Sequence, residues 1–261
     1  MPERRTVAVA GKEIRLLVGG SGPPLLYLHG LGGDVEWLDA HERLAARFAV
    51  HVPAHPGFAD STGVEQVDGV FDLVLHYVDL LDALGLDAVP VVGTSLGGWI
   101  AAELAALYPV RVARLVLVDA VGIWIDATPI AELFGSTAPE LAVLLFHDQH
   151  HPIAQMMQAM TTLADVPEDF AMTQLKALEA AAKVGWNPYL HDPKLERRLA
   201  RVTAPTLVVW GRQDGIVPLV YGERWRDRIP GARLAVIERC GHLPPVERPA
   251  EFAETVLAFL G

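Results

Sequence analysis

The stretch from Val89 to Leu107 restricts the fold of this chain more than any other. Residues 89–92 form a short apolar run that predicts a β-strand, and residues 96–107 predict a helix that ends at Tyr108-Pro109. Between them lies Gly93-Thr94-Ser95-Leu96-Gly97, in which a serine has a glycine two positions before it and another two positions after it. Glycines at those positions let the chain turn sharply and let neighbouring backbone approach closely. The stretch therefore predicts a serine held on a tight turn between a strand and a helix.

Strand and helix signals alternate along most of the chain. Short apolar runs predict an opening hairpin around Gly11-Lys12 and further strands; the strands are expected at residues 7–9, 14–18, 25–28, 49–52, 114–118, 206–210 and 234–237. Helical spacing of apolar residues predicts helices at residues 37–48, 71–84, 219–228 and 249–260. Continuous apolar strands separated by helices are typical of a parallel sheet that is covered on both faces. We therefore expect an α/β fold in which a mostly parallel, twisted sheet is flanked by helices.

Residues 122–201 have a different character. Strand signals are absent there, and helical segments rich in Met, Leu and Ala are interrupted by several prolines. The flanks of this stretch do not have the composition of a linker, so we interpret it as an inserted subdomain and not as a second domain. The predicted organisation is a core made of residues 1–121 and 202–261, with residues 122–201 forming a helical cap, or lid.

Composition limits the partners that the chain can bind. Its 261 residues carry a formal net charge of −11, and 51% of them are hydrophobic. A negative field repels phosphate backbones and anionic lipids, so we expect the chain to bind neither nucleic acid nor a membrane. The apolar stretch after Arg4-Arg5 is too short for a signal peptide, and the single cysteine, Cys240, cannot form an intrachain disulfide. We predict a cytoplasmic protein that acts on a small molecule; a homodimer is compatible with the sequence.

Two further polar side chains lie just past predicted strands. Asp214 follows the strand at residues 206–210, and His242 follows the last strand, in Cys240-Gly241-His242-Leu243. A hydroxyl, an imidazole and a carboxylate are the parts of a nucleophile that is activated by a general base. We therefore expect Ser95, His242 and Asp214 to meet at the carboxyl edge of the sheet.

The motif His29-Gly30-Leu31-Gly32-Gly33 directly follows the predicted strand at residues 25–28. A glycine-rich turn at this place can point main-chain N–H groups at an oxygen that becomes negative during a reaction. By itself the motif can equally be a turn that only reverses the chain.

These motifs and their order along the chain resemble the α/β-hydrolase superfamily over essentially the full length. Within the superfamily, the segments resemble small bacterial esterases, lactonases and meta-cleavage-product hydrolases, which break a carbon–carbon bond. The segments 214–218 and 242–249 match the family's loops around the acid and the histidine. Residues 55–61 resemble the loop after the fourth strand, although the family usually has Asp where this chain has Ala54-His55 and Gly where it has Ala59. Both departures concern a structural loop.

The resemblance implies a role for each residue. Ser95 is expected to be the nucleophile, His242 the general base and Asp214 the acid that orients His242, because the family has the chain order Ser, Asp, His. The oxyanion hole is expected to be formed by the main-chain N–H groups of Leu31 and Leu96, with Gly32 as the alternative to Leu31. Neither a metal nor an organic cofactor is expected.

Several residues allow a second interpretation. Asp119 ends the strand at residues 114–118, where some relatives place the acid, so it is the reserve candidate for the role given to Asp214. The cluster His147-Asp148-Gln149-His150-His151 contains metal-ligating side chains, but we favour a surface patch in a loop of the lid. His29 is expected to be structural, and Cys240 a small buried thiol.

The lid must cover part of the cleft, so some of its apolar residues should line a substrate pocket. The candidates are Trp124, Phe134, Phe146, Met157, Met160, Trp186 and, next to the histidine, Leu243. Such a pocket suits a substrate with an apolar acyl or alkyl part.

Three functions remain open. The first is hydrolysis of a small carboxylic ester or lactone through an acyl-enzyme on Ser95. The second is hydrolysis of a carbon–carbon bond in a meta-cleavage (vinylogous diketone) acid, which usually needs a lid arginine for the substrate carboxylate; lid arginines occur only at Arg197, Arg198 and Arg201. The third is a ligand receptor of the same fold with slow turnover. A serine at position 95 argues against dehalogenases and epoxide hydrolases, which use Asp there.

Overall fold

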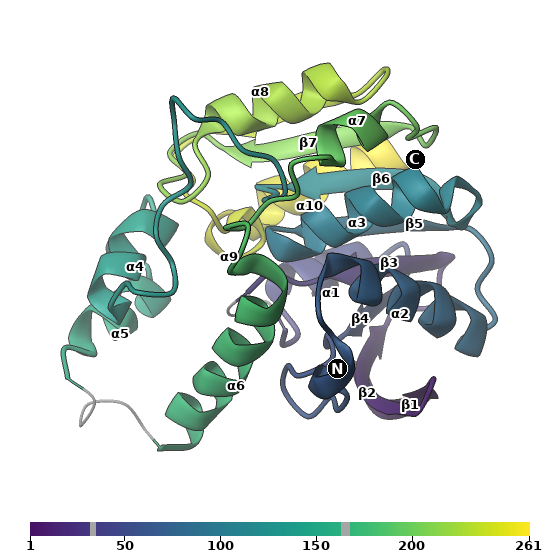
Figure 1. Cartoon of the computed structure of the whole chain (residues 1–261), viewed down its shortest axis with the longest axis horizontal. Coiled ribbons are helices and arrows are strands. Elements are labelled where there is room, and N and C mark those ends of the chain that lie inside the picture. The colour runs from purple at the N-terminus through teal and green to yellow at the C-terminus, as the bar shows by residue number, and fades with distance from the viewer. Residues whose placement is uncertain (32–34, 163–167) are drawn as a thin grey trace.

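The computed structural model describes residues 1–31, 35–162 and 168–261, apart from the side chains of residues 169, 170, 173 and 174. The described chain is built around a sheet of eight strands in the order β1-β2-β4-β3-β5-β6-β7-β8 (Figure 1). The strands are β1 (Glu3–Val9), β2 (Lys12–Gly19), β3 (Pro24–Leu28), β4 (Ala49–Pro53), β5 (Val89–Thr94), β6 (Val112–Val118), β7 (Thr206–Gly211) and β8 (Arg233–Ile237). The pairs β1–β2 and β2–β4 are antiparallel, and all the other neighbours are parallel.

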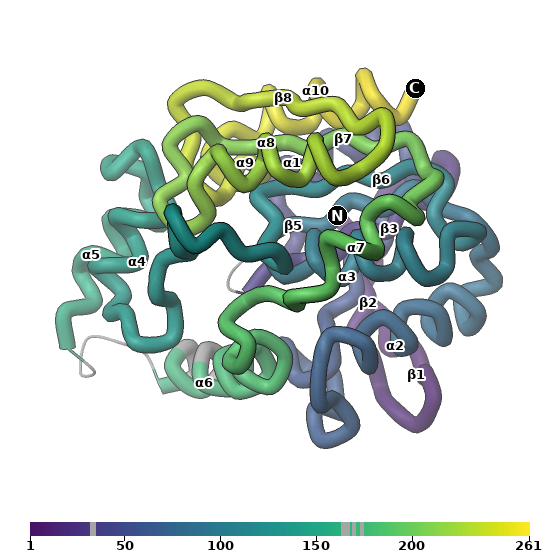
Figure 2. The backbone as a smooth tube through the Cα atoms, turned by 45° about the horizontal axis from the view of Figure 1, so that its top comes forward, coloured from purple at the N-terminus to yellow at the C-terminus, as the bar shows by residue number. Residues whose placement is uncertain are grey.

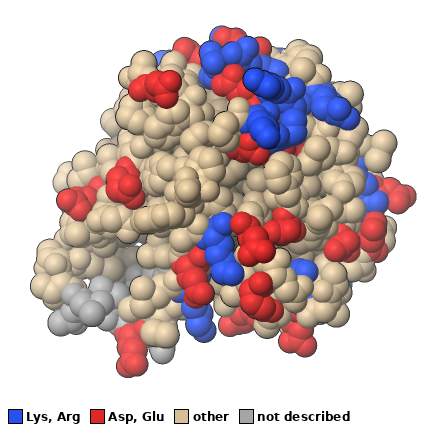
Figure 3. Space-filling view, in the orientation of Figure 1, with Lys and Arg blue, Asp and Glu red and all other residues tan. Residues whose placement is uncertain are grey.

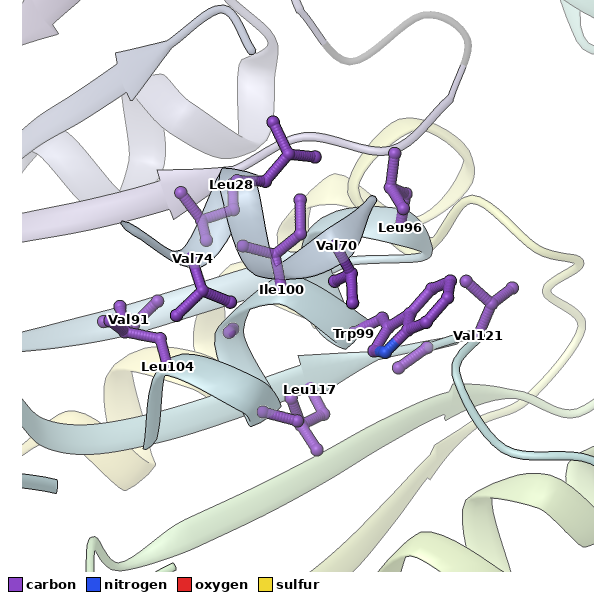
Figure 4. Close-up of a cluster of buried hydrophobic side chains, with 14 of the residues drawn as sticks. Leu28, Val70, Val74, Val91, Leu96, Trp99, Ile100, Leu104, Leu117 and Val121 are labelled. Carbon is purple, nitrogen blue, oxygen red and sulfur yellow. The ribbon is translucent and has the colours of Figure 1, made fainter. Parts of the chain in front are cut away.

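Helices cover both faces of this sheet (Figures 1 and 2). Successive side chains of a strand point to opposite faces, so in β3 the pair Leu25 and Tyr27 packs in one buried cluster and the pair Leu26 and Leu28 in the other. The first cluster is closed by α1 (Asp39–Ala45) and α10 (Pro249–Leu260). The second, part of which is drawn in Figure 4, is closed by α2 (Val70–Ala83), α3 (Leu96–Leu107) and α8 (Leu219–Arg228). The predicted α/β architecture is confirmed.

Several predicted elements have different bounds in the structure; β1, for example, begins at Glu3 and not at residue 7. The hairpin turns at Ala10-Gly11, which both have positive φ, and not at Gly11-Lys12. Lys12 already belongs to β2, where it pairs with Val9 of β1. The helix predicted at residues 37–48 is limited to α1, since the chain is extended at Leu38. Phe48 lies outside that helix yet is buried. The helical spacing that placed it in the predicted helix therefore comes from its packing in the core and not from a helix.

Residues 122–201, between β6 and β7, are helical in their described part. They contain α4 (Ala138–Leu145), α5 (Pro152–Ala159), α6 (Glu168–Gly185) and α7 (Leu195–Leu199), and their described backbone forms no strand beyond a single bridge between Gly122 and His191. In Figure 1, α4, α5 and α6 extend away from the sheet on the left, whereas α7 lies against α3. Arg198 of α7 forms an ion pair with Glu103 of α3, which fixes the end of the insert to the core.

The remaining helices are short. A 3₁₀ turn at Val64–Gln66 precedes α2, another at Pro109–Arg111 follows α3, and α9 (Pro244–Glu247) stands directly before α10. Of the helices that are described, none is both long enough and apolar enough to cross a bilayer.

Several buried histidines make the stability of the fold depend on pH. His76 of α2 is 2% exposed, and among the described residues neither of its ring nitrogens has a hydrogen-bond partner. Burial lowers the pKa of His76 to about 3, with smaller contributions from Lys12 and His55. The folded state therefore keeps this ring neutral at a pH where the unfolded chain, with an ordinary histidine pKa of about 6.5, is already protonated.

We predict that His76→Phe makes the protein less sensitive to acid. The contribution of His76 to stability is complete above the unfolded pKa and is lost as the pH falls toward the folded pKa. Replacement should therefore raise the free energy of unfolding relative to the wild type by about 2 kcal/mol more at pH 5 than at pH 7.5. Urea denaturation at both pH values measures this difference, with the exposed His150→Gln as control. Equal effects at the two pH values would contradict the prediction.

Candidate active site

Ser95 occupies a strained turn between β5 and α3. Its φ is 49° and its ψ is −112°, a backbone conformation that residues other than glycine rarely adopt. The flanking glycines make the turn fit, because a Cβ at Gly97 would lie 2.1 Å from the carbonyl oxygen of Leu28 and one at Gly93 would lie 2.3 Å from that of Gly97. The N–H of Ser95 donates to the carbonyl of Val118 at 2.8 Å, which ties the turn to the end of β6. The side chain is thereby held at the carboxyl edge of the sheet.

His242 lies in the loop after β8 and joins Ser95 to Asp214. Its Nε2 lies 3.0 Å from the Ser95 Oγ, and its Nδ1 lies 2.8 Å from Oδ2 of Asp214. The residues are 5–6% exposed, so this row of three side chains is shielded from bulk water. The structure thus brings Ser95 together with Asp214 and His242, which follow it in the sequence by more than a hundred positions.

Asp214 is held by its own loop after β7. Its Oδ1 accepts hydrogen bonds from the N–H groups of Ile216 at 2.8 Å and Val217 at 2.9 Å. Charge-assisted bonds of this kind stabilise a carboxylate and fix its orientation. Because Oδ1 is engaged by the backbone, Oδ2 is presented to His242.

Asp119, the reserve candidate for the acid, lies beside this row but does not hydrogen-bond to His242. It is 1% exposed, and its Oδ1 accepts the N–H of Gly211 at 2.9 Å. Its Oδ2 has no hydrogen-bond partner among the described residues. Burial raises the pKa of the Asp119 carboxyl well above its usual range, and the neighbouring Asp214 carboxylate raises it further. The geometry therefore favours Asp214 as the partner of the imidazole.

The predicted oxyanion donors lie on neighbouring loops. Leu96 is the first residue of α3, where main-chain N–H groups have no partner within the helix and the helix dipole favours negative charge. Leu31 follows β3, which is the parallel neighbour of β5, so its loop and the Ser95 turn leave the same edge of the sheet. The alternative, Gly32, lies outside the described residues. The oxyanion role stays a prediction.

His29 and Cys240 are both buried. Nε2 of His29 accepts the N–H of His55 at 2.9 Å, and its Nδ1–H donates to the carbonyl of Gly30 at 2.7 Å. Burial lowers the pKa of His29 well below its usual value, which favours the neutral ring. Its two hydrogen bonds hold the chain in place just before Leu31. Cys240 is a free thiol whose pKa is raised by burial and by nearby carboxylates, so it carries little thiolate.

The histidine cluster in the insert is spread along the chain after α4. His147 and His150 are exposed, and the ring of His151 stacks on Phe146. In the part of the chain that the structure describes, the one close group of metal-ligating side chains is Asp119, Asp214 and His242. Both ring nitrogens of His242 already have hydrogen-bond partners there.

The pocket candidates differ in their surroundings. Phe146 is buried, and Trp124 is partly buried with its ring stacked on His191. Trp186 is 62% exposed and meets the ring of Phe134 in an edge-on contact. The others, all partly buried, are Phe134, Met157, Met160 and Leu243. Their role in a pocket stays a prediction, and Trp186 is the one that solvent reaches most.

Comparison with known proteins identifies the family. The model of the alpha/beta hydrolase fold family matches residues 23–249. The chain belongs to this family of hydrolases. A curated relative, the 2-hydroxymuconate semialdehyde hydrolase of Pseudomonas sp. (strain CF600), is 30% identical over 266 residues, which cover 98% of this chain and 93% of the relative.

Solved structures give the same assignment to the α/β-hydrolase fold. A membrane phospholipase A, described as a bacterial virulence factor, superposes with a TM-score of 0.84 at 28% identity, over 99% of this chain and 86% of that one. The 2-hydroxy-6-oxo-6-phenylhexa-2,4-dienoate hydrolase of Rhodococcus sp. strain RHA1 superposes with a TM-score of 0.80 at 24% identity, over 100% and 99% of the two chains. The second likeness shows the fold alone.

We predict that Asp119→Asn stabilises the protein, and increasingly so as the pH rises. A carboxyl whose pKa is raised in the folded state contributes stability at low pH and loses it as the pH rises through that folded pKa. Asparagine keeps the acceptor for the Gly211 N–H and carries no charge. Urea denaturation between about pH 4 and about pH 8 should therefore show a widening advantage over the wild type. The exposed Asp87→Asn serves as control, and an advantage that does not change with pH would argue against the prediction.

Proposed function

We propose that this α/β-hydrolase is a serine hydrolase that cleaves a small carboxylic ester or lactone through an acyl-enzyme on Ser95. The observation that carries the proposal is the hydrogen-bonded row from Ser95 Oγ through His242 to Asp214, at 3.0 Å and 2.8 Å. Such a row is the arrangement in which a serine hydroxyl becomes nucleophilic at neutral pH. The chain order Ser, Asp, His is that of α/β-hydrolases.

Acylation is the first half of the proposed reaction. As Ser95 Oγ attacks the substrate carbonyl carbon, its proton passes to His242 Nε2, and Asp214 stabilises the imidazolium that forms. The carbonyl oxygen becomes an oxyanion that accepts the N–H groups of Leu31 and Leu96; each such donor contributes about 3–4 kcal/mol to lowering the barrier. His242 then gives its proton to the leaving alkoxide, which departs as an alcohol from an ester and stays on the acyl chain as a hydroxyl when a lactone is opened.

Deacylation repeats these steps with water. His242 takes a proton from a water molecule, and the resulting hydroxide attacks the acyl carbon. The second tetrahedral intermediate collapses as His242 returns the proton to Ser95 Oγ, so that the carboxylic acid leaves and the enzyme is regenerated.

We assign residues 122–201 to a cap that covers the cleft, with its apolar side chains contacting the acyl or alkyl part of the substrate. No lysine or arginine occurs between Arg114 and Lys176, a stretch that includes α4 and α5. In Figure 3 the surface on the side of these helices shows acidic but no basic side chains, whereas the largest blue group lies toward α7 and α8 and smaller ones lie lower and at the right of the view. This part of the cap, which includes α4 and α5, suits an uncharged, apolar substrate. The phospholipase A with 28% identity is in line with ester chemistry.

Carbon–carbon bond hydrolysis is the second candidate, because the sequence resembles meta-cleavage-product hydrolases and the relative from Pseudomonas is named 2-hydroxymuconate semialdehyde hydrolase. A substrate with a carboxylate would need a cation close to Ser95. Arg198, the most buried of the three lid arginines, is engaged by Glu103 and Asp192 and faces α3. Arg197 and Arg201 are exposed near the end of the insert. These placements favour an uncharged ester over a carboxylate-bearing diketone.

The first test concerns the reacting residues. Ser95→Ala should remain folded, lose labelling by a fluorophosphonate and lose several orders of magnitude in kcat/KM. Asp214→Asn should lower kcat by about 10⁴-fold, because the imidazole is left in the wrong tautomer. Asp119→Asn, the matched control, should retain activity within about threefold, since Asp119 makes no bond to His242. Turnover by the Ser95 variant, or a larger loss in the Asp119 variant than in the Asp214 variant, would refute the assignment.

The second test concerns the substrate class. The wild type should be assayed with 4-nitrophenyl esters of increasing acyl length, with lactones, and with 2-hydroxy-6-oxo-6-phenylhexa-2,4-dienoate. We expect kcat/KM for the best ester or lactone to exceed that for the diketone acid by at least about tenfold, the effect of some 1.4 kcal/mol. The reverse order would establish the carbon–carbon hydrolase. Turnover of every compound far below the usual range of about 1–1,000 per second would favour the receptor.

A further inference from the structure

Glu247, the last residue of α9, accepts hydrogen bonds from two parts of the molecule. Its Oε1 accepts the N–H of Asp148 at 2.9 Å, and its Oε2 accepts the N–H of His147 at 3.0 Å. The same Oε2 also accepts the N–H of Gly241, the residue immediately before His242, at 3.0 Å. One partly buried carboxylate thus links the chain after α4 of the cap to the loop that carries His242.

Backbone contacts continue this link. The N–H of His242 donates to the carbonyl of Leu145 at 2.8 Å, and the N–H of Gly215, next to Asp214, donates to that of Leu144 at 3.1 Å. Leu144 and Leu145 end α4, where helix carbonyls have no partner within the helix. The last two carbonyls of α4 therefore accept hydrogen bonds from the two loops that hold the general base and the acid.

The sequence permits this approach through two glycines. A Cβ at Gly241 would lie 2.2 Å from the carbonyl oxygen of Leu145, and a Cβ at Gly215 would lie 2.7 Å from that of Leu144. Both distances are shorter than real Cβ contacts, so a side chain at either position would push α4 away from the loops. The close contact between the cap and these loops therefore depends on Gly215 and Gly241, which take no part in the proposed reaction themselves.

The two loops are also joined to each other without Glu247. The N–H of Gln213 donates to the carbonyl of Cys240 at 2.9 Å, and the side chain of Gln213 accepts the N–H of Cys240 at 3.0 Å. Loss of Glu247 would leave this connection in place. What it would remove is the side-chain connection between the His242 loop and residues 147 and 148 of the cap.

We propose that Glu247 is a positioning residue that couples the seating of the cap to the placement of His242. The inference rests on the proposed function, in which Nε2 of His242 must stay within hydrogen-bond reach of Ser95 Oγ. Without the carboxylate, three N–H groups lose their acceptor, and the His242 loop is free to shift with the cap. A misplacement of about 1 Å at a general base can cost about a hundredfold in rate.

The test compares Glu247→Ala, Glu247→Gln and the control Glu254→Ala, which removes an exposed carboxylate from α10. In the glutamine variant the amide oxygen can still accept from His147 and Gly241, while the NH₂ group faces the Asp148 N–H. We expect kcat for a 4-nitrophenyl ester to fall about tenfold to a hundredfold in Glu247→Ala, with KM changed less than about threefold. Glu247→Gln should lie between Glu247→Ala and the wild type, and Glu254→Ala should match the wild type.

Hydrogen exchange followed by mass spectrometry gives a readout that does not depend on turnover. Peptides covering residues 141–150 and 239–247 should exchange faster in Glu247→Ala, and both should do so together. Peptides from β5, α3 and α10 should keep their wild-type exchange. If the alanine variant does not fold, kcat and hydrogen exchange of the glutamine variant test the proposal instead.

Several outcomes would overturn the proposal. Full kcat in Glu247→Ala, faster exchange in only one of the two peptides, or faster exchange spread evenly over the chain would each show that the carboxylate does not couple cap and base. If the wild type itself neither reacts with a fluorophosphonate nor hydrolyses an ester, the proposed function fails. The exchange experiment then still decides whether Glu247 joins the two segments.

Discussion

The strained turn at Ser95 is the constraint on which the rest of the site depends. A residue with a side chain held at a φ of 49° costs about 1–3 kcal/mol, so the surroundings must hold it there. They do so through Leu96, Trp99 and Ile100, which are buried on α3 against the sheet, and through the bond from Ser95 N–H to Val118. Glycine at positions 93 and 97 is what lets strand and helix meet closely enough to enforce the turn.

The order of the strands explains why three distant segments meet. The strands β3, β5, β6, β7 and β8 are consecutive in the sheet and parallel, so the loops that follow them all leave the same edge. Those loops carry Leu31, Ser95, Asp119, Asp214 and His242, respectively. Ligand and catalytic sites of open α/β sheets lie at this edge for the same topological reason.

Much of this could be predicted from the sequence, because the Ser95 motif and the apolar strands have local signatures. The bounds of α1 could not, since Phe48 has helical spacing yet is buried from a position beyond the helix end. The contacts of Leu144 and Leu145 with the loops that hold Asp214 and His242 could not be predicted either, because a sequence does not show where main-chain carbonyls point. Their one signal was glycine at positions 215 and 241, next to Asp214 and His242. Whether the pocket candidates, including Trp186, line a pocket depends on how residues 122–201 pack on the rest of the chain, which the pattern of side chains along the sequence does not encode.

Two buried carboxylates lie beside one imidazole, and their surroundings separate their roles. Asp214 accepts two main-chain N–H groups on Oδ1 and faces His242 with Oδ2, so its negative charge is stabilised where an imidazolium forms. Asp119 accepts one N–H and is buried beside a like charge, which raises its pKa and favours its neutral form. A second full charge there would stabilise the imidazolium further and make His242 slower to give its proton to the leaving group. The raised pKa of Asp119 acts against that second charge, in line with a His242 that both takes a proton and returns it in the two halves of the proposed reaction.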